Sequence, residues 1–312
     1  MRIGIIGAGK VGTSFGLFLK DRGETITGYV SRTYDSACEA AALTGSKAFQ
    51  DPLELIRNSE LIFLTVVDDQ IEPLAAVLAS KLAENIPRPD PGDQRHPIFV
   101  HMSGAHSILA LEPLAAAGFE TASLHPLQSV SEIEQARNAF GDTLFTVEMM
   151  LGGGFEGWLA TIGISFVRIE AENKALYHVG AVFASNFVVT VLDAAIQLFE
   201  QVGFSEEEAR RGLMPLVYGS VDNVARSGAE KALTGPVARG DVATVAKHLE
   251  ALEALEALED LDSGALPEAA ALYKSLSGAT LSLAMRYKLT KDPGAAAELK
   301  ALLAKEDAKH ER

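Results

Sequence analysis

One apolar stretch of this chain contains polar side chains that could carry out proton chemistry. Lys174 and His178 lie four residues apart, and Ser185 and Asn186 interrupt the apolar run 179–192 further along. This stretch is predicted to be a helix, and polar side chains on an apolar helix are costly to bury unless they are paired. A lysine beside a binding crevice can donate a proton to a developing alkoxide or amide. Lys174, His178 and Asn186 are therefore candidate catalytic residues; the alternative is an exposed lysine and a satisfied core histidine.

A second polar group follows two predicted strands, 98–101 and 121–124. Ligands of open α/β sheets bind at the carboxyl ends of the strands, where hydroxyl and imidazole groups can orient a carbonyl or carboxylate. Ordinary capping of loops is the alternative. The group comprises His101, Ser103, His125, Gln128 and Ser129, of which Ser103 and His125 are candidate catalytic residues.

A third candidate is the segment 233–241, which contains Thr234, Gly235 and Pro236. This composition predicts a rigid turn between helices. The turn presents Arg239, which could hold a substrate carboxylate through paired N–H donors. An interhelical turn without a ligand explains the same residues equally well.

A glycine motif at the start of the chain predicts a dinucleotide site. The β-branched run Ile3–Ile6 predicts a strand, Gly7, Gly9 and Gly12 follow at G-x-G-x-x-G spacing, and a helical pattern comes next. The glycines permit a tight turn, close approach of a pyrophosphate, and packing of helix on strand. The expected contacts are Gly7, Ala8, Gly9, Lys10, Val11 and Gly12, with Val66 and Val67 at the end of the predicted strand 61–67, and Ser103.

The end of the second predicted strand, 25–30, indicates which dinucleotide is bound. NAD sites usually carry an acid there for the ribose hydroxyls. This chain has Ser31, Arg32 and Thr33 instead. A guanidinium can pair with a 2′-phosphate, and the two hydroxyls can add donors. The sequence therefore predicts NADP(H), unless Arg32 is merely solvated at a strand end.

Strands alternate with helices up to about Ile169, which predicts a doubly wound parallel sheet of the Rossmann type. The remainder reads as helical, with one long helix expected over 172–201. We therefore expect an NADP-binding domain at 1–170 and an all-helical substrate and dimerisation domain at 171–312.

The overall composition excludes several classes. The net charge of −15 argues against nucleic-acid binding, which needs basic clusters. The single cysteine, Cys38, fits a reducing compartment, so a cytoplasmic location is expected. The apolar run 179–192 is shorter than the ~20 residues of a bilayer span, which argues against a membrane protein. Pairs of His and Cys at zinc-site spacing do not occur, so no metal is expected.

Several motifs together resemble the Rossmann-like oxidoreductases that carry a helical C-terminal domain of unknown function. They are Gly7-Ala-Gly-Lys-Val-Gly12, His101-Met-Ser-Gly104, His125-Pro-Leu-Gln-Ser129, Lys174-Ala-Leu-Tyr-His178, Ala184-Ser-Asn186 and 233–241, and the resemblance spans about residues 1–290. The wider superfamily includes ketopantoate reductase, pyrroline-5-carboxylate reductase and 6-phosphogluconate dehydrogenase. The resemblance implies a helical domain similar to the C-terminal domain of 6-phosphogluconate dehydrogenase, packed over the nicotinamide crevice, and often a dimer.

The resemblance also implies roles for single residues. In ketopantoate reductases a lysine early in the first helix of the second domain donates a proton, and Lys174 matches that place. His178 stands where those enzymes usually have asparagine, which leaves the substrate open. We expect an NADPH-dependent reductase of a small 2-oxo acid with Lys174 as proton donor. Imine reduction of the pyrroline-5-carboxylate reductase type and a non-catalytic NADP-binding sensor or scaffold are the alternatives.

The predicted long helix is apolar around most of its circumference, so we expect it to be buried on nearly all sides. The helices that follow it carry many apolar residues too. We therefore expect a homodimer formed through the C-terminal domain. The residues concerned include Leu213, Met214, Leu216, Val217, Tyr218, Leu272, Tyr273, Leu276, Leu281, Leu283 and Met285.

Overall fold

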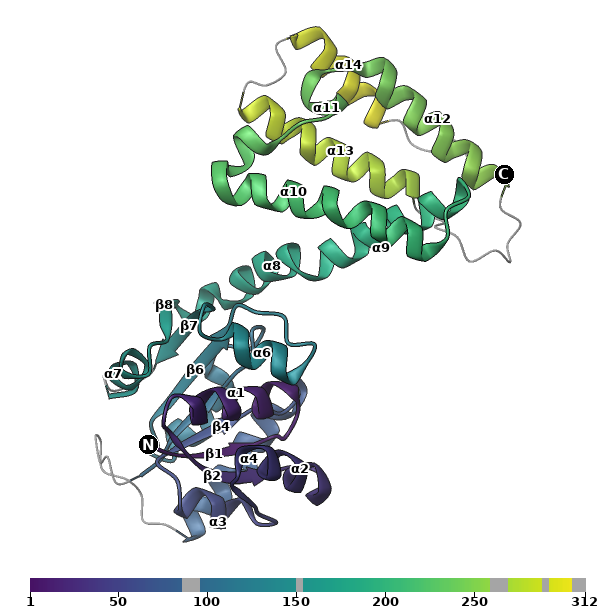
Figure 1. Ribbon diagram of the computed structural model, residues 1–312. Coiled ribbons are helices and arrows are strands. Elements are labelled where there is room, and N and C mark those ends of the chain that lie inside the picture. Colours follow the sequence, from purple (N-terminus) through teal and green to yellow (C-terminus); the bar gives the residue numbers. More distant parts are fainter. Residues whose placement is uncertain (86–95, 150–153, 259–268, 288–291, 305–312) are drawn as a thin grey trace. The chain divides into compact units, whose positions relative to one another are not determined.

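The computed structural model describes residues 1–85, 96–149, 154–258, 269–287 and 292–304 (Figure 1). Contacts divide the chain into two compact units, Met1–Asn186 and Phe187–Arg312. The predicted boundary between residues 170 and 171 marks the end of the sheet. The helix that follows this boundary belongs to the first unit.

In the described part of the first unit, eight strands form one sheet in the order β3-β2-β1-β4-β5-β6-β7-β8. Neighbouring strands are parallel except β6 and β7, which are antiparallel. The predicted doubly wound, mainly parallel sheet is therefore confirmed, with one antiparallel pair that the sequence did not predict. The strands are β1 (Arg2–Ile6), β2 (Thr25–Val30), β3 (Lys47–Ala48), β4 (Leu61–Leu64), β5 (Ile98–His101), β6 (Thr121–Pro126), β7 (Leu144–Met149) and β8 (Ser165–Arg168).

Helices cover both faces of the sheet. Ile5 and Phe63 pack on one face with residues of α1, α2, α6 and α7. Ile62 and Leu64 pack on the other face with residues of α3, α4 and α5. The two-sided burial explains why β4 is apolar at every position. The helices are α1 (Lys10–Asp21), α2 (Tyr34–Thr44), α3 (Pro52–Arg57), α4 (Ile71–Asn85), α5 (Glu112–Ala116), α6 (Ile133–Ala139), α7 (Gly154–Thr161) and α8 (Lys174–Ala184), with short 3-10 turns η1 (Asp68–Gln70), η2 (Ile108–Leu111) and η3 (Ala171–Asn173).

The described part of the second unit is helical, as predicted. Its core brings together Val237, Val245, Leu249, Leu281 and Leu299. A second, smaller cluster includes Leu252, Ala269 and Ala270. The helices are α9 (Asn186–Gln201), α10 (Glu206–Ala232), α11 (Pro236–Arg239), α12 (Val242–Leu258), α13 (Ala269–Arg286) and α14 (Pro293–Leu303).

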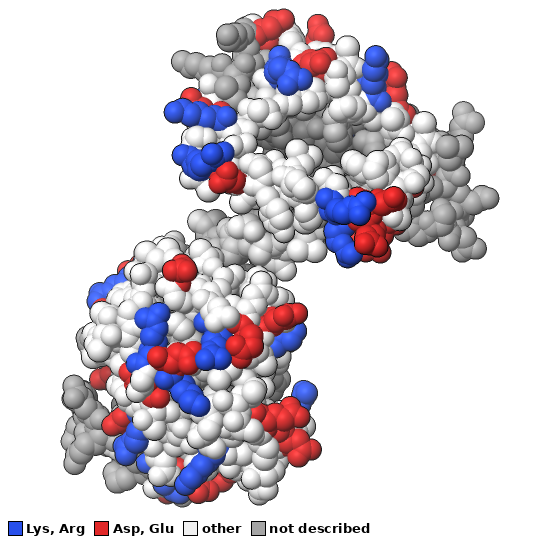
Figure 2. All heavy atoms as spheres, viewed as in Figure 1, with Lys and Arg blue, Asp and Glu red and all other residues white. Residues whose placement is uncertain are grey.

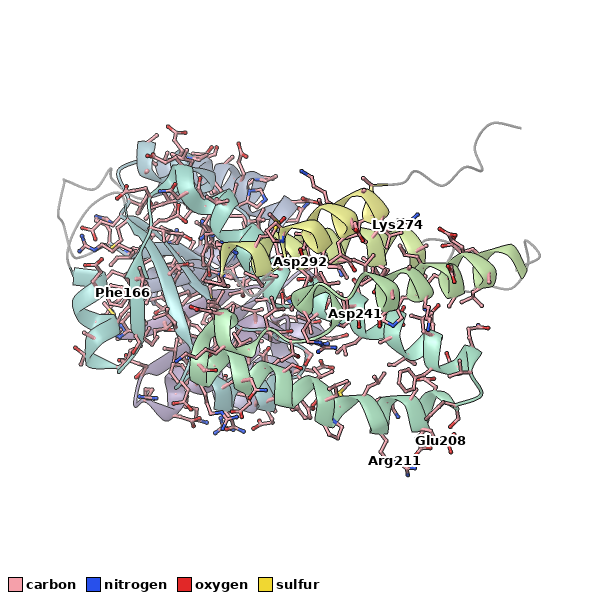
Figure 3. The ribbon with its side chains drawn as sticks, turned by 90° about the horizontal axis from the view of Figure 1, so that it is seen from above. Phe166, Glu208, Arg211, Asp241, Lys274 and Asp292 are labelled. Atoms are coloured by element: carbon pink, nitrogen blue, oxygen red, sulfur yellow. The ribbon has the colours of Figure 1, made fainter. Side chains whose placement is uncertain are left out.

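Side-chain caps fix where several helices begin. Ser205 and Glu208 form a capping box at α10. Asp241 accepts hydrogen bonds from the Thr244 amide and hydroxyl at 3.1 and 2.7 Å, and so caps α12. Asp292 caps α14 in the same way, and both aspartates are labelled in Figure 3. The predicted break at Thr234-Gly235-Pro236 is also present, between α10 and α11.

The long helix predicted over 172–201 differs from the structure in two respects. It consists of α8 and α9, because Ser185 leaves the helical conformation at φ −128° and ψ −75°. We also expected burial on nearly all sides, and this was wrong for the single chain. Leu176, Phe183 and Val189 are 74%, 64% and 68% exposed. A helix that is apolar on all sides is expected to be buried. The sequence does not show whether residues of the same chain or of another molecule bury it.

The segment Ala171–Gln201 is long and apolar enough to cross a membrane, with a mean hydropathy of 1.8 and 6% of the window buried. Its beginning, however, is anchored in the sheet. Lys174 forms an ion pair there with Glu148 of β7. Acidic and basic side chains are interspersed on the face of the first unit seen in Figure 2.

Candidate active site

The three glycines after β1 differ in their surroundings. Gly7 has φ +116°, and a Cβ there would lie 2.6 Å from the carbonyl carbon of Thr65. A Cβ on Gly12 would lie 2.2 Å from the Gly7 carbonyl oxygen, so α1 packs against the loop. Nothing lies within 4 Å of the Cβ position at Gly9. The loop is thus closed behind Gly7 and Gly12 and open at Gly9, where a phosphate can approach the backbone.

The start of α1 can receive an anion. Gly9 is its N-cap, and no side-chain hydrogen bond caps this helix among the described residues. The free amide groups of a first helical turn favour negative charge. Lys10 begins the helix and is exposed, and Val11 is partly buried. Val66 and Val67 follow β4, the neighbour of β1.

The residues after β2 have separate roles in the structure. Ser31 accepts a hydrogen bond from the Ala8 amide at 3.4 Å and so supports the glycine loop. Thr33 is the N-cap of α2. Arg32 is exposed. Arg32 is thus available for a 2′-phosphate, and the Ser31 hydroxyl, which accepts from Ala8, can still donate its own proton.

Register across the sheet puts the glycine loop and the polar cluster at one edge. Ile6, the residue before Gly7, pairs with Leu64, and Leu64 pairs with His101. His101 pairs with Ser123, which in turn pairs with Glu148. Strands are ~4.8 Å apart, so Ile6 of β1 and Ser123 of β6 are separated by about 14 Å. An extended dinucleotide can cover this distance.

Lys174 lies at this edge and is 1% exposed. Its Nζ forms an ion pair with Glu148 Oε1 at 2.8 Å and donates a hydrogen bond to Ser123 Oγ at 2.9 Å. Burial lowers the pKa of Lys174, and the hydrogen bond and charge of Glu148 oppose that shift. The other Glu148 oxygen, Oε2, accepts from the Ile108 amide at 3.0 Å. Lys174 and Glu148 therefore form a buried, charge-compensated ion pair.

His101 and Ser103 shape the loop after β5. His101 Nδ1 accepts from the Ser103 amide at 3.2 Å, and Nε2 lies 3.1 Å from the Ser107 carbonyl oxygen, to which it can donate. Burial lowers the pKa of His101 to about 3, so the ring is neutral. Ser103 Oγ accepts from the amides of Ala105 and His106 at 3.1 and 3.0 Å. Both side chains thus hold backbone in place.

His125 and His178 flank Gly104. A Cβ built on Gly104 would lie 2.7 Å from His125 Nε2 and 2.8 Å from His178 Nδ1. The two rings are nearly perpendicular, with centroids 6.4 Å apart. His125 Nδ1 lies 2.6 Å from the hydroxyl of Tyr177. The His178 Nδ1 atom is buried and has no hydrogen-bond partner among the described residues.

Two further predicted candidates, Asn186 and Arg239, are on the helices that follow α8. Asn186 begins α9, about two helical turns beyond His178, and is exposed. Ser185 donates a hydrogen bond to its Oδ1 at 3.0 Å. Arg239 ends α11 in the second unit and is exposed.

The sequence did not single out Ser123, Glu148 and Tyr177, although all three contact the predicted residues. Glu148 had a detectable signal, because a carboxylate inside an apolar strand requires a partner. The lysine at 174 is the matching cation. Ser123 and Tyr177 carried no comparable signal.

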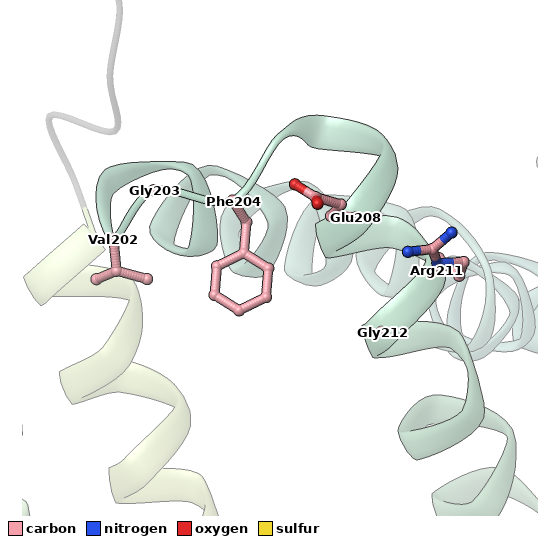
Figure 4. Close-up of a pocket in the computed structure, with 6 residues that line it drawn as sticks. All are labelled: Val202, Gly203, Phe204, Glu208, Arg211 and Gly212. Atoms are coloured by element: carbon pink, nitrogen blue, oxygen red, sulfur yellow. The ribbon is translucent and has the colours of Figure 1, made fainter.

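One open pocket lies in the second unit, at the turn between α9 and α10 (Figure 4). It is lined by Val202, Gly203, Phe204, Glu208, Arg211 and Gly212. Glu208 is already engaged in the capping box with Ser205. Within the described ranges, no group of three His, Cys, Asp or Glu side chains could hold a metal ion.

Two family models match this chain. A Rossmann-like domain matches residues 1–126, and a domain of unknown function, DUF2520, matches residues 155–280. The chain therefore combines a Rossmann-like domain with a helical DUF2520 domain, which confirms the resemblance seen in the motifs. No curated protein matches the chain.

Solved structures share the fold. A candidate NADP oxidoreductase from Bacteroides fragilis has a TM-score of 0.65 and 21% identity, over 90% of this chain and 98% of that one. An imine reductase from Streptomyces aurantiacus has a TM-score of 0.60 and 16% identity, over 98% and 100%. A pyrroline-5-carboxylate reductase from Coxiella burnetii has a TM-score of 0.54 and 15% identity, over 93% and 98%. At these identities the similarity establishes the fold.

Proposed function

We propose that this chain is an NADP(H)-dependent reductase of a small carbonyl or imine substrate. One observation carries the proposal. The register of paired strands places the end of β1, where the glycine loop begins, at the same edge of the sheet as the buried cluster around Lys174. The similar structures named above as an NADP oxidoreductase and as imine and pyrroline-5-carboxylate reductases are in keeping with it.

The cofactor assignment rests on the fit of the glycine loop and of Arg32. Open space at Gly9 accommodates the pyrophosphate, and the start of α1 favours its charge. Arg32 would pair with the 2′-phosphate through charge-assisted hydrogen bonds. When bound, the nicotinamide would supply a hydride, and the protein would position the substrate and supply a proton.

The substrate has two candidates. For a 2-oxo acid, Lys174 would donate the proton, Ser103 and Asn186 would orient the carbonyl, and His125 would hold the carboxylate. A protonated imine carbon is already activated and depends less on a lysine. Lys174 is buried and paired with Glu148, which makes it less available as a proton donor. This observation is the reason for keeping the imine as the second candidate.

A substrate screen with matched variants separates these candidates. NADPH oxidation is followed with panels of small 2-oxo acids and of cyclic imines. If Lys174 is the general acid, Lys174→Met should lower kcat for an oxo acid by about a hundredfold or more. It should reduce turnover of an imine much less. Lys81→Met, at an exposed position on α4, is the control.

Lys174→Met leaves Glu148 buried without its cation, which can damage the fold. The double variant Lys174→Met/Glu148→Met removes both charges and keeps the test valid if the single variant is unstable. Full turnover of a 2-oxo acid by either variant would rule out Lys174 as proton donor. Tight NADPH binding without oxidation by any panel member would favour the non-catalytic sensor.

We also propose that the chain forms a homodimer through its helical domain. Four apolar residues of α10 are exposed in the single chain, namely Leu216, Tyr218, Val221 and Val224. Such a surface is typical of an interface between subunits. A cytoplasmic location, which the single free Cys38 favours, stays a prediction.

A further inference from the structure

We propose that Tyr177 and His125 form a proton relay that delivers a proton to the reacting substrate atom beside Gly104. This inference rests on the proposed function, because the relay needs a substrate to receive the proton. It is an alternative to proton donation by Lys174. It assigns the last proton-donating atom to His125 Nε2, which then does not hold a carboxylate, and gives Tyr177 a positioning and resupplying role.

The geometry of the pair suits such a relay. The Tyr177 hydroxyl lies 2.6 Å from His125 Nδ1. The two rings meet at 82° with centroids 5.6 Å apart, so the hydroxyl approaches the edge of the imidazole where the nitrogen lone pair lies. The opposite nitrogen, Nε2, is directed at the position that a side chain on Gly104 would fill. A side chain at 104 would collide with His125 Nε2, so glycine at this position keeps that nitrogen free of a side chain on this side.

The electrostatic surroundings decide which atoms carry protons. Burial lowers the pKa of His125 to about 3, and the charge of Lys174 and the neighbouring His178 lower it further. The imidazole is therefore neutral and has one bare nitrogen. Burial also raises the pKa of Tyr177, although the hydrogen bond of Thr146 opposes this shift, so the phenol stays protonated. Hence Tyr177 donates to Nδ1, and the proton of His125 is on Nε2, facing Gly104.

The relay balances without a charged imidazole. As hydride adds to the substrate carbon, the C=O or C=N π bond breaks and its oxygen or nitrogen takes the proton from Nε2. His125 Nδ1 takes the proton of Tyr177 in the same step. The resulting phenolate lies beside the ammonium of Lys174, whose Nζ is 5.8 Å from the centre of the Tyr177 ring. After product release, a proton from water enters at Nε2, and the Nδ1 proton returns to Tyr177.

The arrangement gives Lys174 a part in the reaction without requiring contact with substrate. Its charge disfavours an imidazolium at His125, so the ring cannot store the proton as a cation. The same charge stabilises a nearby phenolate. A relay through the ring is therefore easier than simple donation by a protonated histidine.

Tyr177→Phe removes the hydroxyl and keeps the ring. With any substrate that the parent reduces, we expect kcat to fall at least about tenfold, the lower part of what general acids contribute. KM and the dissociation constant of NADPH should stay unchanged. The matched control is Tyr273→Phe, which breaks a similar bond in the second unit, 2.8 Å from Tyr273 Oη to His248 Nδ1, and should leave kcat unchanged.

A second measurement needs no substrate. Nitrogen-15 chemical shifts of His125 in the cofactor-free chain should show an unprotonated Nδ1 and a protonated Nε2 at neutral pH. Tyr177→Phe should change the ratio of the two imidazole tautomers. A proton on Nδ1 in the parent, or an unchanged kcat in Tyr177→Phe, would overturn the relay. A parent chain that reduces nothing would instead count against the proposed function, and the nitrogen shifts would still decide whether the pair has the tautomer that the relay needs.

Discussion

His101 illustrates how a single buried side chain links the site to the stability of the sheet. Its two ring nitrogens contact backbone groups of the loop after β5, and its side chain is buried. Burial lowers the pKa of His101 from 6.5 to about 3. The folded chain therefore keeps this ring neutral while the unfolded chain protonates it.

The consequence is a stability that decreases in acid. Because the folded pKa lies below the unfolded one, the stabilisation is fully present above pH 6.5 and is lost as the pH falls towards 3. His101 alone should reduce the free energy of unfolding by about 1.4 kcal/mol per pH unit in that window. Urea unfolding followed by the fluorescence of Trp158, the single tryptophan, measures it. His101→Gln should flatten the pH dependence by this amount, and an unchanged slope would contradict the assignment.

At the residue scale, the sequence identified one side of each interaction and missed the other. Lys174 and His125 were predicted because a lysine on an apolar helix and a histidine after a strand are unusual. Glu148 and Tyr177 complete their contacts, but pairing them requires the strand register and the docking of α8, which are long-range properties. The antiparallel β7 is what places Glu148 opposite Ser123.

At the scale of elements, the glycine loop allows a specific prediction because its glycines differ in the space around their Cβ positions. A side chain at Gly12 would collide with the Gly7 carbonyl oxygen, whereas the Cβ position at Gly9 is open. Gly9 also has φ −81°, which alanine can adopt. Stability and cofactor binding should therefore respond separately to the two positions.

Gly9→Ala should leave the melting temperature nearly unchanged and weaken NADPH binding at least about tenfold, since the methyl group would occupy the phosphate path. Gly12→Ala should lower the melting temperature of the first unit instead. Gly157→Ala, at an open helical position on α7, controls for the added methyl group. An NADPH affinity of Gly9→Ala equal to that of the parent would argue against phosphate binding at this loop.

Secondary structure was largely predictable, because parallel strands buried on both faces are continuously apolar and capping residues mark helix starts. The break between α8 and α9 was not, since Ser185 and Asn186 are compatible with a continuous helix in sequence. The exposure of the same helices could not be predicted either. Hydrophobicity does not distinguish a surface buried by its own chain from one buried by another molecule.

At the scale of the whole molecule, the exposed apolar residues of α10 predict self-association. Light scattering should give a mass about twice the 33.1 kDa of the chain. Val221→Glu/Val224→Glu places charges on that helix and should shift the mass towards one chain. Leu43→Glu, at an exposed position on α2, should not. A parent mass of one chain at micromolar concentration would contradict the dimer.

The most direct test of the central claim is a comparison of NADPH and NADH binding to the parent and to Arg32→Ala. Titration is followed by nicotinamide fluorescence or by energy transfer from Trp158. The parent should bind NADPH about ten- to a hundredfold more tightly than NADH, which matches about 1.5–3 kcal/mol for hydrogen bonds to a charged group. Arg32→Ala should lose this preference and retain its affinity for NADH. Equal affinity of the parent for both dinucleotides, or binding of neither, would contradict an NADP(H)-dependent reductase.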